Sequence, residues 1–171
     1  MQMKATWYEE IKSRRSIRKF TPEEVDDQTI DTIIEMGTWA PSGLNNQPWK
    51  FVVVKEKETL NKLSRHTLYS HIIKNASACI AVFFDNNASY NREKDIQAIG
   101  ACLQNMLLAI HHLGLGGVWL GEILKNREQV EKLLEVPDGV ELMAVIALGH
   151  PAEKPGKGTR KPLDQVIIAR K

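Results

Sequence analysis

Residues 94–113, KDIQAIGACLQNMLLAIHHL, form the longest apolar helical pattern in the chain. Apolar residues recur there at helical spacing and leave little of the circumference polar, so we expect a central, buried helix. Gly114 follows directly and is expected to end this helix, because glycine is common just past a helix C-terminus. The rest of the fold is expected to pack around this segment.

Buried strands are predicted by apolar runs at residues 49–54, 79–84, 118–120 and 142–148. Shorter helical patterns occupy residues 6–14, 56–66, 69–75 and 127–134, and a further one ends at Gly37. That last helix begins either at a Thr21 cap followed by Pro22, or at Asp26 or Asp27. Strands separated by helices predict an α+β or α/β sandwich, which we expect to be one domain over residues 1–171.

The C-terminal segment 151–171 extends beyond this pattern. Its first part is polar and rich in Gly, Pro and Lys, and residues 163–169 are apolar enough for a further strand. An apolar strand beyond a complete domain is expected to pair with an edge of its own sheet or with a partner subunit.

Composition narrows the function classes. The chain has 171 residues and a formal net charge of +2, without a long basic run, so we expect no nucleic-acid partner. No apolar run reaches the roughly 18 residues that span a membrane, and the N-terminus lacks an apolar signal core. Cys79 and Cys102 lie in apolar segments and are expected to be buried free thiols. Together these features predict a cytoplasmic protein without a membrane association.

Residues 14–18, RRSIR, place three guanidinium groups and a hydroxyl within five residues. Arginine is always charged and offers paired donors in a plane, which suits a phosphate. If the segment is extended, Arg14, Ser16 and Arg18 point to one side. The alternative is a solvated basic turn. A second basic group, around Arg160 in the C-terminal segment, has the same two interpretations.

Residues 39–49, WAPSGLNNQPW, form a loop that combines two Trp, two Pro and three side-chain amides around a glycine. A rigid backbone with aromatic faces and amide donors suits a flat heteroaromatic ligand. The alternative is an ordinary connection whose Trp side chains fill the core. Residues 114–121 carry four glycines; we assign Gly114 and Gly116 to the end of the helix, whereas Gly121 is a candidate for close backbone approach to a ligand.

In this order the segments resemble the signature of the FMN-dependent nitroreductase family. The matching residues are 14–18, 41–49, 104–109, Trp119 with Gly121, and 160–163. The resemblance covers nearly the whole chain. It implies an α+β three-layer fold in which helices flank a central, mostly antiparallel sheet. It also implies a homodimer whose C-terminal tails, residues 151–171, are swapped over the partner subunit.

The resemblance also implies the ligands and the residues that hold them. FMN would be bound non-covalently, and NAD(P)H would reduce it for transfer to a small nitroaromatic, quinone or enone by a ping-pong mechanism. The phosphate and ribityl chain would be held by Arg14, Ser16, Arg18 and Arg160. Arg15 would lie at the pyrimidine edge as electrostatic support. The partner subunit would contribute Pro41, Ser42 and Gly43 against the dimethylbenzene side, with Asn45 in the same loop, and Leu120 and Gly121 would offer backbone groups.

Several alternatives remain open in the sequence. No side chain is a certain catalytic group, and the five histidines lack the spacing of metal ligands. The chain could carry or sense FMN without turnover, or cleave a flavin. The tail is similar to that of the iodotyrosine deiodinase branch. However, Arg65 and Asn86 stand four residues before Tyr69 and Tyr90, where that branch has a lid glutamate. This departure disfavours dehalogenation of tyrosines.

Overall fold

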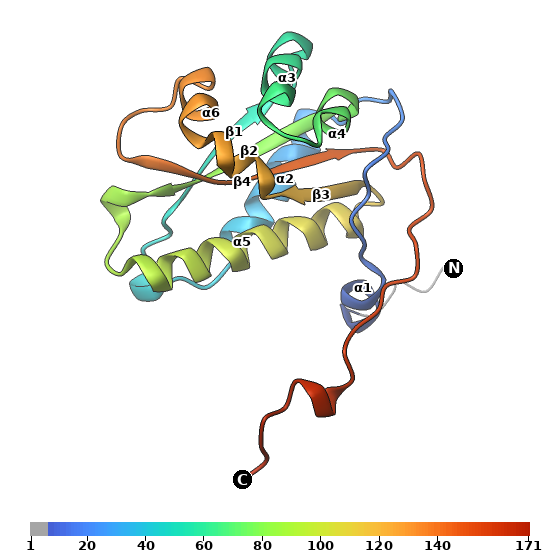
Figure 1. The fold of residues 1–171 in the computed structure, drawn as a ribbon, viewed down its shortest axis with the longest axis vertical. Coiled ribbons are helices and arrows are strands. Elements are labelled where there is room, and N and C mark those ends of the chain that lie inside the picture. Colours follow the sequence, from blue (N-terminus) through green and yellow to red (C-terminus); the bar gives the residue numbers. More distant parts are fainter. Residues whose placement is uncertain (1–6) are drawn as a thin grey trace.

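A four-stranded antiparallel sheet forms the centre of residues 7–171, the part of the chain that the computed structural model describes. Its strands stand in the order β1-β2-β4-β3 (Figure 1). Their bounds are Trp49–Val54 for β1, Ala78–Asp85 for β2, Gly116–Leu120 for β3 and Val140–Gly149 for β4. All four predicted strands are therefore confirmed. The two central strands, β2 and β4, are the most completely buried, as their continuous apolar runs require.

Helices cover both faces of the sheet, so the predicted α+β three-layer arrangement is confirmed (Figure 1). On one face lie α2 and α5, and on the other lie α3, α4 and α6, while α1 packs beside the C-terminal end of α5. The helices span Trp7–Ser13 (α1), Asp27–Thr38 (α2), Lys57–Leu63 (α3), Ser70–Asn75 (α4), Arg92–His112 (α5) and Arg127–Leu133 (α6). Among these described helices, none combines the length and the apolar character that crossing a membrane requires.

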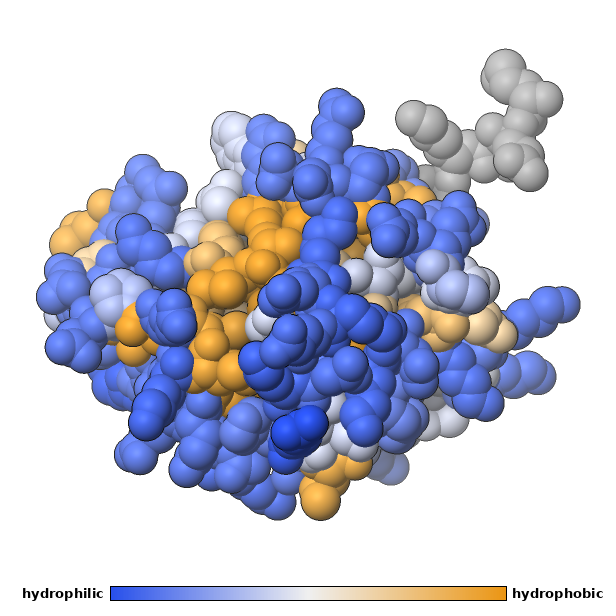
Figure 2. Space-filling view, turned by 90° about the horizontal axis from the view of Figure 1, so that it is seen from above, coloured by the Kyte–Doolittle hydropathy of each residue, from blue (hydrophilic) through white to orange (hydrophobic). Residues whose placement is uncertain are grey.

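The sheet separates two apolar cores. On one face, Phe84 of β2 packs with Ile33 of α2 and Met106 of α5. On the other face, Phe83 packs with Leu63 of α3 and Ile73 of α4. Neighbouring residues of a strand point to opposite faces, so β2 supplies both cores. Figure 2 looks onto the second face, where a hydrophobic band is visible between hydrophilic residues.

Some predicted boundaries need correction. The cap of α2 is Asp26, whose carboxylate accepts from the Thr29 amide at 2.7 Å, and not Thr21. The Thr21 amide instead donates to the His150 carbonyl at 2.8 Å, which commits this residue to pairing with the start of the tail. The predicted helix 56–66 is α3 followed by a 3-10 turn, Ser64–His66. The helix expected at 6–14 is α1, and residue 6 lies outside the described part of the chain.

The apolar end of the tail does not form a strand. Residues Leu163–Gln165 make a single 3-10 turn, and Leu163, Val166 and Ile168 are exposed. Figure 1 shows the tail running away from the body of the protein. Pairing with an edge of its own sheet is therefore wrong, because the tail turns away before it could reach either edge strand.

The two cysteines provide a test of the cores. Both Cys79 and Cys102 are buried, and burial raises the pKa of each thiol to about 12. Because the thiolate is the reactive form, we expect neither thiol to react with a disulfide reagent at pH 8 in the native protein. After denaturation, two thiols per chain should react. Rapid labelling of the native protein would contradict the described packing.

Candidate functional site

The arginine segment is held against β3. Arg14 still continues α1, because its amide donates to the Glu10 carbonyl at 3.1 Å. Beyond it, Ser16 forms a parallel bridge with Gly117, and the Ile17 amide donates to the Gly117 carbonyl at 3.1 Å. The Ile17 side chain is buried and thereby anchors the charged residues on either side of it.

Gly116 makes this anchoring possible. A Cβ at Gly116 would lie 2.6 Å from Cγ2 and 2.8 Å from Cβ of Ile17, too close for any side chain. Gly114, by contrast, has a φ of +76° and open space around it, as expected for a residue that ends a helix. The assignment of Gly116 to the helix end is therefore incomplete, because its smallness serves the contact with Ile17.

The first residues of the tail pair with the same segment. The Ala152 amide donates to the Lys19 carbonyl at 2.9 Å, and Phe20 bridges to Pro151. The Arg18 amide donates to Oε1 of Glu153, also at 2.9 Å. This pairing directs the tail across residues 14–18, and it carries Arg160 towards Arg14. Glu153 was not among the predicted residues, because only the fold shows that it faces Arg18.

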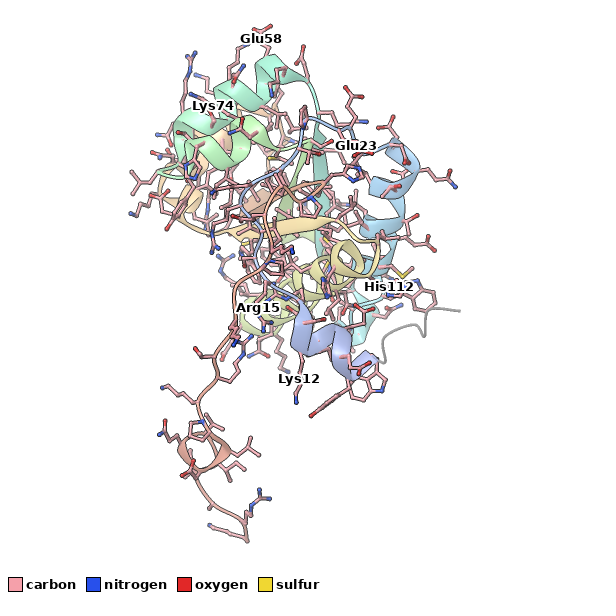
Figure 3. The ribbon with its side chains drawn as sticks, turned by 90° about the vertical axis from the view of Figure 1, so that its right-hand side faces the viewer. Lys12, Arg15, Glu23, Glu58, Lys74 and His112 are labelled. Atoms are coloured by element: carbon pink, nitrogen blue, oxygen red, sulfur yellow. The ribbon has the colours of Figure 1, made fainter. Side chains whose placement is uncertain are left out.

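Three guanidinium groups gather where the tail crosses. Burial lowers the pKa of Arg14, and the neighbouring charges of Arg160 and Arg15 lower it further. Arg15 donates to the carbonyls of Lys12 and Arg14 at 2.6 and 2.7 Å, and its buried Nε has no hydrogen-bond partner within the described chain. Figure 3 shows Arg15 at the base of the tail, beside α1. Mutually repelling cations with spare donors form a site that suits an anion.

Arg14 and Arg15 both line one pocket of about 210 Å³, together with Ile110, His111 and Glu153. The predicted alternation of Arg14, Ser16 and Arg18 requires an extended segment, and a departure from extended backbone occurs at Arg14. Its physical cause is the helical hydrogen bond of Arg14, which delays the start of extended backbone. Arg18 is exposed, and its guanidinium donates to the Ser16 carbonyl at 3.3 Å.

His111 is a pocket residue that the sequence analysis did not identify. Its Nε2 lies 2.8 Å from Oγ of Ser13, whose own proton goes to the Glu9 carbonyl at 2.7 Å. His111 must therefore be the donor in this pair. Burial lowers the pKa of His111, the Glu10 carboxylate opposes this, and Arg14 and Arg15 add to the lowering. The position of His111, one residue before the end of α5, is the signal that could have placed it near Arg14.

The predicted loop lies elsewhere in the same chain. Pro41, Ser42 and Gly43 border a shallow cleft against Lys94 and Gln97 of α5. The arginine pocket contacts α5 at Ile110 and His111, nearer its other end. A helical rise of about 1.5 Å per residue separates Gln97 from Ile110 by about 20 Å. The structure therefore does not bring the two predicted segments together within one chain, and Asn45 stays with the loop.

Leu120 and Gly121 lie at the far end of β3 from the bridge at Gly117. Leu120 is buried, whereas Gly121 is exposed. The next residue, Glu122, accepts from Oγ1 of Thr67 at 2.8 Å and from the Leu68 amide at 2.9 Å. Gly121 therefore presents its backbone in a fixed position beside residues 67–68.

An apolar groove of about 570 Å³ opens between α1, α2 and α5. Its lining includes Trp7, Ile11, Met36, Trp39 and Leu113, all of which are well exposed. Of the two loop tryptophans, only Trp49 fills the core, since Trp39 is 77% exposed. Exposed apolar surface of this kind is typical of a binding interface.

The geometry therefore defines a class of protein: a three-layer α+β chain with a pocket beside β3 whose arginine side chains suit an anion. A sequence profile described as the Nitroreductase family matches residues 11–70 and 61–150. The chain belongs to the nitroreductase family.

Three relatives show how close the likeness is. A Methanothermobacter thermautotrophicus protein, provisionally named NADH dehydrogenase/NAD(P)H nitroreductase, is 39% identical over 86% of this chain and 78% of its own. A solved structure from Desulfovibrio desulfuricans, provisionally named a nitroreductase and in complex with FMN, is 44% identical with a TM-score of 0.91. That match covers 96% of each chain. The structure of Vibrio harveyi NADPH:FMN oxidoreductase complexed with NAD+ is 29% identical with a TM-score of 0.87, over 96% of this chain and 76% of the other.

Gly116→Ala tests the contact that anchors the arginine segment. The added methyl group overlaps Ile17, which can only yield by moving the backbone of residues 16–18. Overpacking of this kind typically costs about 1–3 kcal/mol. We expect urea unfolding to show a loss of stability in that range. Gly156→Ala, where a Cβ meets nothing within 4 Å, should leave the stability nearly unchanged. Equal effects of the two substitutions would contradict the assigned contact.

Proposed function

We propose that this chain is an NAD(P)H-dependent FMN oxidoreductase. It would act as a homodimer and pass hydride equivalents to a small oxidised acceptor such as a nitroaromatic, a quinone or an enone. The family membership supports this proposal, as do the relatives named for NADPH:FMN oxidoreduction and for a complex with FMN. The observation that carries it is the cluster of Arg14, Arg15 and Arg160.

The donor set of this cluster fits the phosphate of FMN. A phosphate dianion would offset the repulsion among the three guanidiniums and would give the free Nε of Arg15 a partner. Ser16, on the same segment, would add its hydroxyl, and Arg18 would reach the ribityl chain. Because Arg15 lies within the cluster, we assign it to the phosphate first. Electrostatic support of the pyrimidine edge is the second role that we propose for Arg15.

The separation of the two segments along α5 supports a dimer. Pro41, Ser42, Gly43 and Asn45 lie about 20 Å along α5 from the arginine pocket and border a different part of the chain's surface. A two-fold axis that crosses α5 near its middle would bring the loop of one subunit to the arginine pocket of the other. In a dimer about this axis, the partner subunit would cover the apolar groove of α1, α2 and α5. The tail, which finds no partner in its own sheet, would then lie over the second subunit.

When bound, FMN supplies hydride transfer at N5 of its isoalloxazine ring. The chain binds, orients and shields the ring, and it needs no nucleophile or general-base pair of its own. The backbone of Leu120 and Gly121 would contact the ring, and residues 67–68, fixed by Glu122, would border the open side. NAD(P)H and the acceptor would occupy that side in turn, which gives ping-pong kinetics.

The direct experiment is a visible spectrum of the purified protein, followed by anaerobic addition of NADH or NADPH. We expect flavin absorption bands that bleach on addition and return when a quinone or nitroaromatic is added. Flavin bands that persist would favour a carrier or sensor of FMN. A protein that shows no flavin bands, even after incubation with FMN, would contradict the proposal.

Arg14→Ala tests the phosphate site. Hydrogen bonds to charged groups contribute about 1.5–3 kcal/mol, so the Kd for FMN should rise about tenfold to a hundredfold. Lys132→Ala, which removes one positive charge from the exposed surface of α6, serves as the control and should leave the Kd unchanged. Titrations followed by flavin fluorescence give both constants. An equal rise of the Kd in both variants would indicate a general electrostatic effect and would contradict the assignment of Arg14 to the phosphate.

A further inference from the structure

The loop of residues 42–47 has a backbone that its own sequence does not favour. Leu44, Asn45 and Gln47 have φ angles of +55°, +54° and +46°. The left-handed region is unfavourable for residues other than glycine, although asparagine tolerates it better than most. Such a conformation persists only where the surroundings hold it in place. Something outside the loop must therefore maintain its shape.

Asn46 connects the loop to that support. Its Nδ2 donates to Oδ1 of Asp95 at 2.8 Å and to the Ala88 carbonyl at 2.9 Å. Two acceptors on one side fix the orientation of the amide, because only its NH₂ group can serve both. The buried Oδ1 of Asn46 has no partner within the described chain. The contact with Asp95 therefore holds Asn46 at the cost of an unsatisfied acceptor.

Asp95, in the first turn of α5, is fully buried. Besides Asn46, its carboxylate accepts from Oγ of Ser89 at 2.7 Å and from the amides of Tyr90 and Asn91 at 3.2 and 3.1 Å. Burial alone would raise the pKa of Asp95, but these hydrogen bonds outweigh it and the pKa is lowered. A buried carboxylate with several donors is strongly held, and it fixes whatever donates to it.

A second contact joins the same elements. The Tyr90 ring packs so closely on Gly43 that a Cβ there would fall 1.9 Å from its Oη. Tyr90 is itself held through its amide by Asp95. One carboxylate therefore fixes the loop from two directions, through Asn46 and through Tyr90.

We propose that Asp95 is a positioning residue: through Asn46 and Tyr90 it holds residues 42–47 in the strained shape that presents Pro41, Ser42 and Gly43 to the FMN of the partner subunit. The functional half of this inference rests on the proposed function. The half that concerns loop shape can be tested without FMN. Asp95 itself touches neither cofactor nor substrate.

Hydrogen exchange of the FMN-free protein tests the loop shape in Asp95→Asn. The reporters are the amides of Asn45, Asn46 and Gln47, which donate to the Ser42 carbonyl, the Gly43 carbonyl and Oγ of Ser42, each at 3.1 Å. Asparagine has nearly the same shape, but it is uncharged and its amide NH₂ group replaces one acceptor oxygen with a donor. We expect protection of these amides to fall about tenfold or more, as loss of a hydrogen bond to a charged group predicts.

Val130→Ala is the matched control, because it removes buried apolar volume from α6, on the opposite face of the sheet. Val130→Ala should lower the free energy of unfolding. At a temperature well below the unfolding transition of both variants, it should leave hydrogen exchange in the loop unchanged. Unchanged loop protection in Asp95→Asn, or an equal loss in Val130→Ala, would overturn the proposal.

The affinity for FMN tests the functional half. With the wild-type chain as reference, Asp95→Asn should raise the Kd for FMN at least about tenfold, and Val130→Ala should not. A wild-type chain that binds no FMN contradicts the proposed function, whereas the exchange data still test the loop. A loosened loop with an unchanged Kd overturns the positioning role. If Asp95→Asn does not fold, Ser89→Ala removes a single donor and should give the same changes in smaller measure.

Discussion

The length of α5 is the constraint on which the rest of the site depends. This helix spans Arg92–His112 and carries one candidate binding segment near each end. Its rigid backbone keeps the loop of residues 41–45 about 20 Å from the arginine pocket. In the proposed dimer, a ligand that needs both segments would meet them where the two chains combine. The same dimer would cover the exposed groove of α1, α2 and α5 and the exposed end of the tail.

The arginine pocket depends on a small number of short contacts. The bridge between Ser16 and Gly117 fixes the segment on β3, and the absence of a side chain at Gly116 lets Ile17 lie flat beneath it. Pairing of Ala152 with Lys19 then brings the tail, and with it Arg160, across the segment. The charges of Arg14, Arg15 and Arg160 are therefore gathered by apolar packing and backbone pairing, since they repel one another. A bound anion would offset this repulsion.

Much of the fold could be predicted from the sequence, because its signals are local. The apolar runs gave the four strands, and the helical pattern of 94–113 gave α5 to within two residues at its start. The conformation at the end of the tail could not be predicted. An apolar segment indicates that its side chains need to be buried, but it does not indicate which surface buries them. The hydrogen bond between Asn46 and Asp95 was also missed, because these residues are 49 positions apart in the sequence. A single aspartate in a helix is usually a surface residue, so its burial gave no signal. The placement of His111 and Glu153 likewise depends on tertiary contacts.

Mixed dimers provide the most direct test of a site shared between chains. One variant, Arg14→Ala, damages the phosphate pocket, and a second, Pro41→Glu, places a charge on the loop. Each alone should bind FMN poorly. If the loop of one subunit serves the pocket of the other, a mixed dimer of the two variants has one site with both defects and one intact site. Co-expression and isolation of the mixed dimer with two different tags should therefore restore FMN binding at one site per dimer. A mixed dimer that binds FMN no better than either variant would contradict the shared site.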